Sequence, residues 1–275
     1  PHSEYERMRA PFQEGDFPWP LKYGYSAVGR IEAGPPELLG QTIFCLYPHQ
    51  TRFVVPASAV SVLPEGVPPA RAVLAANMET AINGLWDAKP LIGERIVVIG
   101  AGVVGLAAAH LASKIPGARV QIVDPLKAKA KIAEALGLDF AAPEEAKGEA
   151  DLVVHASGSP SGLRTALALA GFEARIVELS WYGETSVELP LGGAFHSKRL
   201  KLISSQVGHL PPAQMPRWDY AKRIALALEL LRDPVYDVLL TGEDAFENLP
   251  KIMSRIAEDR TILCHRIRYS DEEPN

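Results

Sequence analysis

The sequence predicts an α/β protein in which a doubly wound parallel sheet is joined to a β-rich domain. Three observations support this fold class. Strand-like and helix-like runs alternate from Arg95 onward, which is typical of a parallel sheet covered by helices on both faces. A glycine-rich run, Gly100–Gly105, follows the first of those strands. The first 76 residues instead contain short β-like runs separated by proline and glycine.

The predicted elements follow the chain in order. In the first 76 residues the expected strands are AVGRIEA, TIFCLY, RFVVPA and AVSVLP. Helical spacing runs from Pro68 to Ala88. The alternating region has strands RIVVIG, RVQIVD, DLVVHASG, ARIVELS and RLKLISSQ, with helices VVGLAAAHLASKI, PLKAKAKIAEALG and SGLRTALALA between them. After Pro216 we expect a helix DYAKRIALALELLRD, a strand VLL, a helix ENLPKIMSRIAE and a strand TILCHRIR.

Composition narrows the class of protein. The length of 275 residues suggests two domains, and 47% hydrophobic with 22% charged residues is ordinary for a globular enzyme. The net charge of -5 argues against nucleic acid or an anionic membrane as a partner, and no apolar run is long enough to span a membrane. Cys45 and Cys264 lie outside any C-x-x-C pair, so we expect reduced thiols and a cytoplasmic protein. The chain begins with Pro1, so we expect the natural start to lie earlier.

The glycine-rich run has the residues that dinucleotide binding requires. Gly100 permits a tight turn, Gly102 lets a pyrophosphate approach the backbone, and Gly105 lets helix and strand pack closely. The run lies between a predicted strand and a predicted helix, and Asp124 ends the next strand 24 residues after Gly100. A carboxylate there binds the ribose hydroxyls of NAD and repels the 2′-phosphate of NADP. The sequence therefore predicts a Rossmann unit that prefers NAD, with NADP not excluded because Lys127 and Lys129 follow.

These residues and their setting resemble the medium-chain dehydrogenase/reductase superfamily, which includes the alcohol dehydrogenases. The similar segments are GYSAVGRIEAG, FVVPASAVSVLPEGV, ETAINGLWDAKPLIGERIVVIGAGVVGLAA and EDRTILCH. Within the superfamily, HQTRFVVPA and AANMETA resemble the branch of hydroxyethyl bacteriochlorophyllide dehydrogenase-like proteins. The resemblance implies a GroES-like catalytic domain, N-terminally truncated here, at residues 1–76 and 206–275, and a Rossmann domain at 77–205. It implies an active site between the two.

The resemblance also implies a set of residues near the cofactor. An arginine in the C-terminal strand region reaches the pyrophosphate in the family, a lysine lies near the adenosine ribose, and the ends of two strands border the nicotinamide. In this sequence the implied cofactor-binding residues are Thr80, Gly100, Gly102, Val103, Val104, Gly105, Asp124, Lys129, Ala156, Ser157, Gly158, Leu179, Ser180, Trp181 and Arg260. Trp181, Tyr182 and Trp218 are candidates for an aromatic substrate wall, or else they pack in the core.

The zinc ligands of the superfamily are missing at the matched positions. Where the family has Gly-His-Glu the chain has Gly24-Tyr25-Ser26, and Ala75 or Ala76 stands in place of a cysteine. Catalytic zinc needs three Cys, His or carboxylate ligands, so we expect no metal. A site built from His49, Glu79 and His209 is the alternative.

Without zinc, a side chain must manage the proton of the alcohol. The candidates are Tyr25, which replaces a ligand; His49, whose pKa range suits proton relay; and Glu79, at the start of the hinge helix. The alternatives are a packed strand tyrosine, an exposed turn histidine and an acid in the first turn of a helix.

The expected function is hydride transfer between nicotinamide and a secondary alcohol or ketone, without zinc. A quinone or enone reductase and a non-catalytic dinucleotide-binding protein are the alternatives. The expected partners are a small-molecule substrate and a second copy of the chain, paired through KRLKLISSQ at the edge of the sheet. The sequence does not identify the substrate or the direction of reaction.

Overall fold

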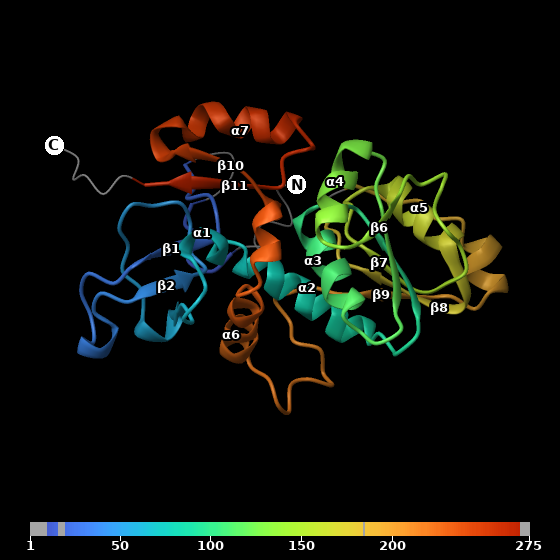
Figure 1. Cartoon of the computed structure of the whole chain (residues 1–275), viewed down its shortest axis with the longest axis horizontal. Coiled ribbons are helices and arrows are strands. Elements are labelled where there is room, and N and C mark those ends of the chain that lie inside the picture. Colours follow the sequence, from blue (N-terminus) through green and yellow to red (C-terminus); the bar gives the residue numbers. More distant parts are fainter. Residues whose placement is uncertain (1–9, 16–19, 184, 270–275) are drawn as a thin grey trace. The chain divides into compact units, whose positions relative to one another are not determined.

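The chain forms two compact units, each with its own sheet or sheets. The computed structural model describes residues 10–15, 20–183 and 185–269. Unit 1 takes in residues 1–76 and 221–275, and unit 2 is the continuous segment 77–220 (Figure 1). The division falls inside helix α2 (Ala75–Ala88) and at the start of α6 (Tyr220–Leu230).

Unit 2 is built on a six-stranded parallel sheet with the order β6-β5-β4-β7-β8-β9. From β4 the chain adds strands in one direction, and from β7 it adds them in the other, so the order reverses between β4 and β7. This is the strand order of a Rossmann fold. The strands are β4 (Arg95–Ile99), β5 (Arg119–Val123), β6 (Asp139–Ala141), β7 (Ala150–His155), β8 (Ala170–Glu178) and β9 (Lys201–Ser204).

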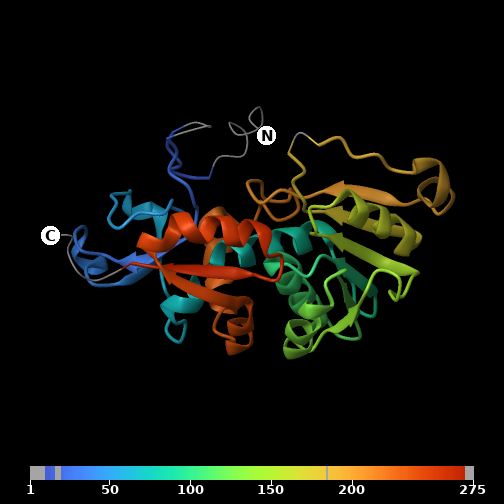
Figure 2. The same ribbon diagram turned by 90° about the horizontal axis from the view of Figure 1, so that it is seen from above.

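Helices cover both faces of this sheet. Right-handed crossovers that move in opposite directions along a sheet lie on opposite faces. Figure 2 accordingly shows α5 on one side of the strands and α4 on the other. The inner strands are short β-branched runs, and Ile96, Val98 and Ile122 have no exposed surface, as expected for strands buried on both faces. The helices are α3 (Val103–Ser113), α4 (Ala130–Ala135) and α5 (Pro160–Leu169), with a 3-10 turn at Lys127–Lys129 and a π turn at Leu191–Phe195.

Unit 1 contains two small sheets. Three antiparallel strands pair in the order β1-β2-β3, and β10 and β11 form a parallel pair joined through α7. The first sheet places Ile43, Cys45 and Tyr47 in a small core. The elements are β1 (Ala27–Arg30), β2 (Thr42–Cys45), β3 (Val60–Val62), α1 (Pro69–Ala72), β10 (Leu240–Ala245), α7 (Leu249–Glu258) and β11 (Cys264–Arg268), with 3-10 turns at Pro36–Leu38, Ala57–Ala59, Pro234–Leu239 and Phe246–Asn248.

An ion pair between a buried arginine and a half-exposed aspartate joins the two chain segments of unit 1. The guanidinium of Arg71, in α1, donates from Nε and Nη2 to the two carboxylate oxygens of Asp237, both at 2.7 Å. Its Nη1 donates to the carbonyls of Leu231 and Arg232. The Arg71 side chain is only 7% exposed, so these acceptors replace the water that the cation loses.

Most predicted elements are present, but two expectations need correction and one strand was not predicted. RFVVPA is not a strand: Val54 is 96% exposed, and Pro56 has no amide to donate to a ladder. VLL is mostly a 3-10 turn, and the strand begins at Leu240. The three-residue strand β6 was not predicted, because so short a run shows no periodicity.

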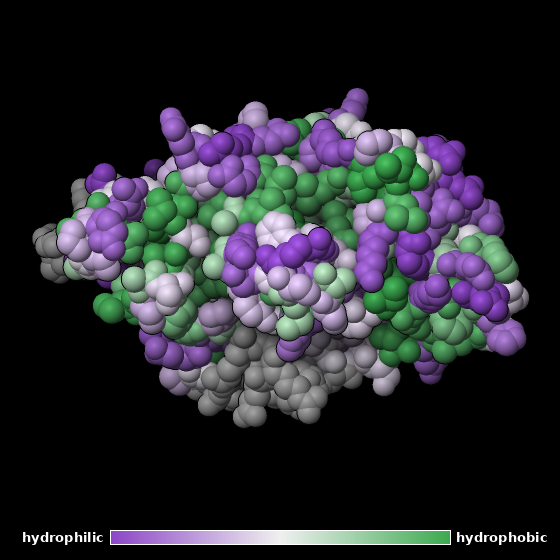
Figure 3. All heavy atoms as spheres, turned by 90° about the horizontal axis from the view of Figure 1, so that it is seen from below, coloured by the Kyte–Doolittle hydropathy of each residue, from purple (hydrophilic) through white to green (hydrophobic). Residues whose placement is uncertain are grey.

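Within the described part of the chain, no helix is both long and apolar enough to cross a membrane. On the face drawn in Figure 3, hydrophilic and hydrophobic residues are interspersed. Exposed hydrophobic side chains such as Ile92 and Phe172 are of the kind that most folded proteins carry.

Candidate dinucleotide and catalytic site

The glycine-rich turn lies at the carboxyl end of β4, where the strand order reverses. Gly100 has a φ of +104°, and a Cβ there would lie 2.7 Å from the Cα of Ser157. A Cβ on Gly105 would collide with the carbonyl oxygen of Gly100. Both positions therefore require glycine, and the turn packs directly on the end of β7. At Gly102, in contrast, no atom lies within 4 Å of the Cβ position, so the space in front of the turn is open.

The turn leads into the N-terminus of α3, which is suited to an anion. Gly102 is the N-cap residue and no side chain caps the helix. The first amides of a helix point outward and carry partial positive charge. Val103 and Val104 are partly exposed. The turn, the open space and the uncapped helix start together fit the pyrophosphate of a dinucleotide.

Asp124 follows β5 and is held by three donors from the protein. Its Oδ2 accepts from the Ala101 amide at 2.8 Å and from Lys129 Nζ at 3.2 Å, and its Oδ1 accepts from the Leu126 amide at 2.9 Å. Asp124 and Lys129 are 6% and 8% exposed. A carboxylate offers about four acceptor sites, so roughly one remains for a ribose hydroxyl. The Lys129 ammonium therefore offsets much of the negative charge of Asp124, which the sequence alone suggested would face the ribose.

The ends of β7 and β8 are adjacent, and two of the implied residues meet there. The Gly158 amide donates to Ser180 Oγ at 3.0 Å, which joins the two strand ends. Ser157 is exposed and Ala156 half-buried. Leu179 points into unit 2 instead, because a Cβ on Gly84 of α2 would lie 2.6 Å from its Cδ2. Trp181 is 46% exposed.

A hydrogen-bonded network under these strand ends was missed by the sequence analysis. His155 ends β7, is fully buried, and pairs in register with Glu178 at the end of β8. Its Nδ1 lies 2.7 Å from Glu178 Oε2, and its Nε2 lies 2.6 Å from Ser157 Oγ. Tyr182 OH donates to Glu178 Oε2 at 2.9 Å, and the Ser180 amide donates to Oε1 at 2.7 Å. The signal available was a histidine inside the apolar run DLVVHASG.

The network holds Glu178 as a carboxylate. Burial opposes its charge, but the hydrogen bonds from His155 and Ser180 outweigh this and lower the pKa of Glu178. Burial, together with the hydrogen bond to Glu178, raises the pKa of Tyr182. Tyr182 therefore belongs to this network rather than to a free aromatic wall. The rings of Trp218 and Trp86 lie 4.9 Å apart at an angle of 48°, and both side chains are partly exposed.

In unit 1, Tyr25 and His49 lie in neighbouring segments. The Cβ position of Gly24 is 2.7 Å from His49 Cδ2, and the His49 amide donates to the Tyr23 carbonyl. Tyr25 is 49% exposed at a bend before β1, so it is not a packed strand residue. His49 is half-buried, with Nδ1 at 3.1 Å from Tyr269 OH, and burial lowers its pKa. The alternative of an exposed turn histidine is therefore wrong.

Two further candidates lie on α2, and one lies on a turn. Glu79 is 5% exposed and occupies the fifth position of α2, so it is not an acid of the first turn. Thr80 is half-buried beside it. Arg260 is exposed in the turn between α7 and β11, in unit 1.

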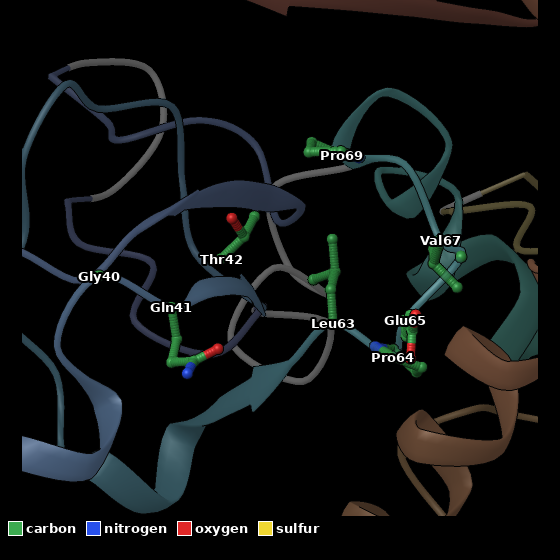
Figure 4. Close-up of a pocket in the computed structure, with 9 residues that line it drawn as sticks. Gly40, Gln41, Thr42, Leu63, Pro64, Glu65, Val67 and Pro69 are labelled. Carbon is green, nitrogen blue, oxygen red and sulfur yellow. The ribbon is translucent and has the colours of Figure 1, made fainter.

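A surface hollow in unit 1 is separate from all these residues. Its volume is about 320 Å³, and Figure 4 shows the side chains around it. It contains none of the predicted site residues, and it is lined by Gly40, Gln41, Thr42, Leu63, Pro64, Glu65, Gly66, Val67 and Pro69. Among the residues that the structure describes, no three His, Cys, Asp or Glu side chains are grouped as metal ligands.

Comparison with known proteins agrees with this geometry. Residues 75–158 match the family model of the alanine dehydrogenase/PNT C-terminal domain. D-guloside 3-dehydrogenase of Escherichia coli (strain K12) is 26% identical over 224 residues, covering 77% of this chain and 61% of the relative. The chain thus spans less than two thirds of the length of that relative.

Solved structures show the same fold. Galactitol-1-phosphate dehydrogenase from Escherichia coli superposes with a TM-score of 0.74 at 18% identity, covering 90% of this chain and 84% of that one. An alcohol dehydrogenase from Escherichia coli CFT073, solved with NADH, gives 0.68 at 18% identity, covering 86% and 80%. The chain therefore shares the fold of these alcohol and polyol dehydrogenases, and it is similar in sequence to one sugar dehydrogenase. The six-stranded parallel sheet, the small antiparallel sheet and these structural neighbours confirm the fold class that the sequence predicts.

Proposed function

We propose that this chain is a member of the medium-chain dehydrogenase/reductase superfamily, an NAD(H)-preferring oxidoreductase that interconverts a secondary alcohol and a ketone. The observation that carries the proposal is the Gly100–Gly105 turn at the strand-order reversal, with Asp124 after the next strand. The turn and the start of α3 hold the pyrophosphate, and Asp124 receives the adenosine ribose. When bound, the dinucleotide supplies the acceptor or donor of a hydride.

The substrate class is supported by the relatives. One is a D-guloside 3-dehydrogenase and one structural neighbour is a galactitol-1-phosphate dehydrogenase, and both names describe oxidation of hydroxylated carbon compounds.

We test the proposal with NAD⁺ and a panel of secondary alcohols, including cyclohexanol and myo-inositol, and follow nicotinamide absorbance. The absorbance of NADH is expected to increase with at least one of these alcohols. Tight NADH binding without turnover of any alcohol or ketone would favour the non-catalytic alternative, and turnover of quinones or enones alone would favour the reductase.

We propose that catalysis is independent of zinc. The matched ligand positions hold Tyr25, Ser26 and alanine, and none of these is a cysteine, a histidine or a carboxylate, the ligands that zinc usually takes in proteins. Purified protein should therefore contain well below one zinc per chain, and dialysis against a chelator should leave turnover unchanged. Elemental analysis by mass spectrometry measures both samples. Stoichiometric zinc whose removal abolishes turnover would contradict this prediction.

Tyr25, His49 and Glu79 are our candidates for contact with the reacting hydroxyl group. Tyr25→Phe removes one hydroxyl and should lower kcat about tenfold, the worth of about one hydrogen bond made to the transition state. The Kd for NADH should change less than twofold. Stopped-flow turnover and fluorescence titration give the two quantities. An unchanged kcat would move the assignment from Tyr25 to His49.

We propose a homodimer formed through strand β9. This strand is the edge of the six-stranded sheet, and Lys201, Leu202 and Ser204 are exposed on it. An open edge offers unpaired backbone groups to a second sheet. Light scattering at micromolar protein should give twice the chain mass, and a monomeric mass would contradict the assignment.

We also propose a cytoplasmic location. Cys45 and Cys264 are both free, and burial raises the pKa of each thiol to about 11, so they stay protonated and unreactive. Unpaired thiols are usual in reducing compartments.

A further inference from the structure

We propose that Ser157 and His155, backed by Glu178, form the proton-transfer pair of this enzyme. Ser157 Oγ would receive the hydroxyl proton of the alcohol while its own proton passes to His155. The inference rests on the oxidoreductase function proposed above and names the group where the substrate proton leaves.

The hydrogen bonds around Ser157 leave one position for a substrate. A serine hydroxyl has one proton to donate and two lone pairs that accept. The proton faces His155 Nε2 at 2.6 Å, and one lone pair accepts from the Ser159 amide at 3.2 Å. The second lone pair is unassigned, and Ser157 is exposed at the carboxyl end of β7.

Glu178 determines which nitrogen of His155 is basic. A carboxylate only accepts hydrogen bonds, and both Glu178 oxygens lie within 2.8 Å of Nδ1. Nδ1 therefore carries the proton in the neutral imidazole, and Nε2 presents its lone pair to Ser157. Glu178 also stabilises the imidazolium that forms when Nε2 is protonated.

The structure keeps room for this pair. A Cβ on Gly162, in the first turn of α5, would collide with Ser157 Oγ and lie 2.7 Å from His155 Nε2. Glycine at this place lets the helix start beside the two polar atoms without covering them. A buried hydrogen bond between His155 and Glu178 that served only stability would not require a serine on its far side, at the exposed end of β7.

The pair also lies over the appropriate half of the sheet. A dinucleotide spans the two halves of a Rossmann sheet, and an acid such as Asp124 after β5 marks the adenosine half. The nicotinamide half is then over the ends of β7 and β8, where Ser157 and Ser180 lie.

Ser157, His155 and Glu178 also resemble the catalytic triad of a hydrolase, but the backbone amides next to Ser157 argue against acyl transfer. Such a site needs backbone N–H groups aimed at an oxyanion. The Gly158 amide already donates to Ser180 Oγ, and the Ser159 amide already donates to Ser157 Oγ. The geometry therefore favours proton transfer over nucleophilic attack.

The step balances in the direction of alcohol oxidation. The carbinol C–H bond breaks, and its hydrogen leaves with both electrons as hydride to oxidised nicotinamide dinucleotide. The O–H proton goes to Ser157 Oγ, the serine proton goes to His155 Nε2, and the C–O bond becomes a carbonyl. One ketone, one reduced dinucleotide and one imidazolium result, and the proton returns to water through Ser157.

Variants that differ in one hydroxyl test the proposal. Ser157→Ala should lower kcat roughly a hundredfold, the low end of the contribution of a general base. Ser157→Thr keeps a hydroxyl and should restore most of the rate. Ser161→Ala, whose Oγ contacts Ser159 Oγ but not His155, is the matched control and should leave kcat unchanged. The Kd for NADH should stay within twofold in Ser161→Ala.

A second measurement uses the protein without cofactor or substrate. ¹⁵N NMR of the histidine side chains, with His155→Gln to assign the signal, should show Nδ1 protonated and Nε2 not. Ser157→Ala should shift the Nε2 signal, and Glu178→Gln should move the tautomer equilibrium. A purely packing role would not require this tautomer.

The possible outcomes distinguish failure of the proposed oxidoreductase function from failure of the proton-transfer proposal alone. Absence of turnover and of dinucleotide binding in the wild type overturns the proposed function and this inference with it. Wild-type turnover that Ser157→Ala retains, or a proton on Nε2 in the wild type, overturns the inference alone. A large loss in Ser157→Ala, rescue by Ser157→Thr and the Nδ1–H tautomer together support it.

Discussion

Replacing Asp124 with serine is expected to shift cofactor preference toward NADP(H) by about 10- to 100-fold, since a hydrogen bond to a charged group contributes about 1.5–3 kcal/mol. The change removes the carboxylate that accepts a ribose hydroxyl and repels a 2′-phosphate. It also leaves Lys129 without the carboxylate that lies 3.2 Å from its Nζ in the wild type. A buried ammonium at that place would attract the phosphate.

Lys129→Met is the matched control, because it removes the opposite charge from the same buried pair. It should move the ratio of the Kd for NADPH to that for NADH in the other direction. Fluorescence titration of both dinucleotides against wild type and both variants gives the ratios. Tighter binding of NADPH by the wild type would contradict the NAD preference. An equal loss for both dinucleotides in Asp124→Ser would instead indicate that the Ala101 amide has lost its acceptor and the turn has loosened.

Asp237→Ala is expected to destabilise the protein by about 1.5–3 kcal/mol, the range for a hydrogen bond to a charged group. Arg71 would keep its carbonyl acceptors but lose both carboxylate contacts. The loss is smaller than for a fully buried pair because the Asp237 side chain is 53% exposed and water reaches its place. Urea unfolding monitored by circular dichroism measures the change. Glu229→Gln removes an exposed pair with Arg232 and should cost less than about 1 kcal/mol.

The contribution of this pair should depend on pH in one direction. The hydrogen bond from Arg71 lowers the pKa of Asp237 against the opposing effect of burial. A group with a lowered folded pKa stabilises the fold above its unfolded pKa, about 3.9 for aspartate, and loses that contribution as pH falls through the folded value. The difference between wild type and Asp237→Ala should therefore be constant between pH 7 and about pH 5 and shrink below about pH 4. A difference that grows on acidification would contradict this assignment.

The sequence predicted the alternating strands and helices of unit 2, but it did not show which single apolar runs fail to form strands. The alternating runs of unit 2 appear as β4, α3, β5 and the elements after them, because buried parallel strands leave apolar runs that sequence periodicity detects. RFVVPA also contains apolar β-branched residues but is not a strand, since Val54 points to solvent and no strand among the described residues pairs with it. Strand pairing is a tertiary property, so residues 52–57 alone do not reveal it.

In the candidate site, too, local features were predictable from the sequence and contacts between distant residues were not. The spacing of the glycines and Asp124 is local, and the structure gives each glycine a steric reason. The contact between His155 and Glu178 is not local, because 23 residues separate them and only the pairing of β7 with β8 brings them together. The charge of Asp124 looked uncompensated in the sequence, and only the fold shows Lys129 beside it. Whether Tyr25, His49 and Arg260 act on ligands stays a prediction.

Unit 1 is formed by two separate segments of the chain, so its folding during synthesis must wait for the second segment. Unit 2 is one uninterrupted segment, so all its strands have been translated once residue 220 has been added. Unit 1 needs Asp237 and the strands β10 and β11, which come from residues translated later. At ribosomal rates of about 5–20 residues per second, the first 76 residues wait roughly 3–10 seconds after unit 2 is complete before their partners emerge. During that interval the apolar strand TIFC depends on the rest of its own small sheet, and on chaperones, to avoid association with other chains.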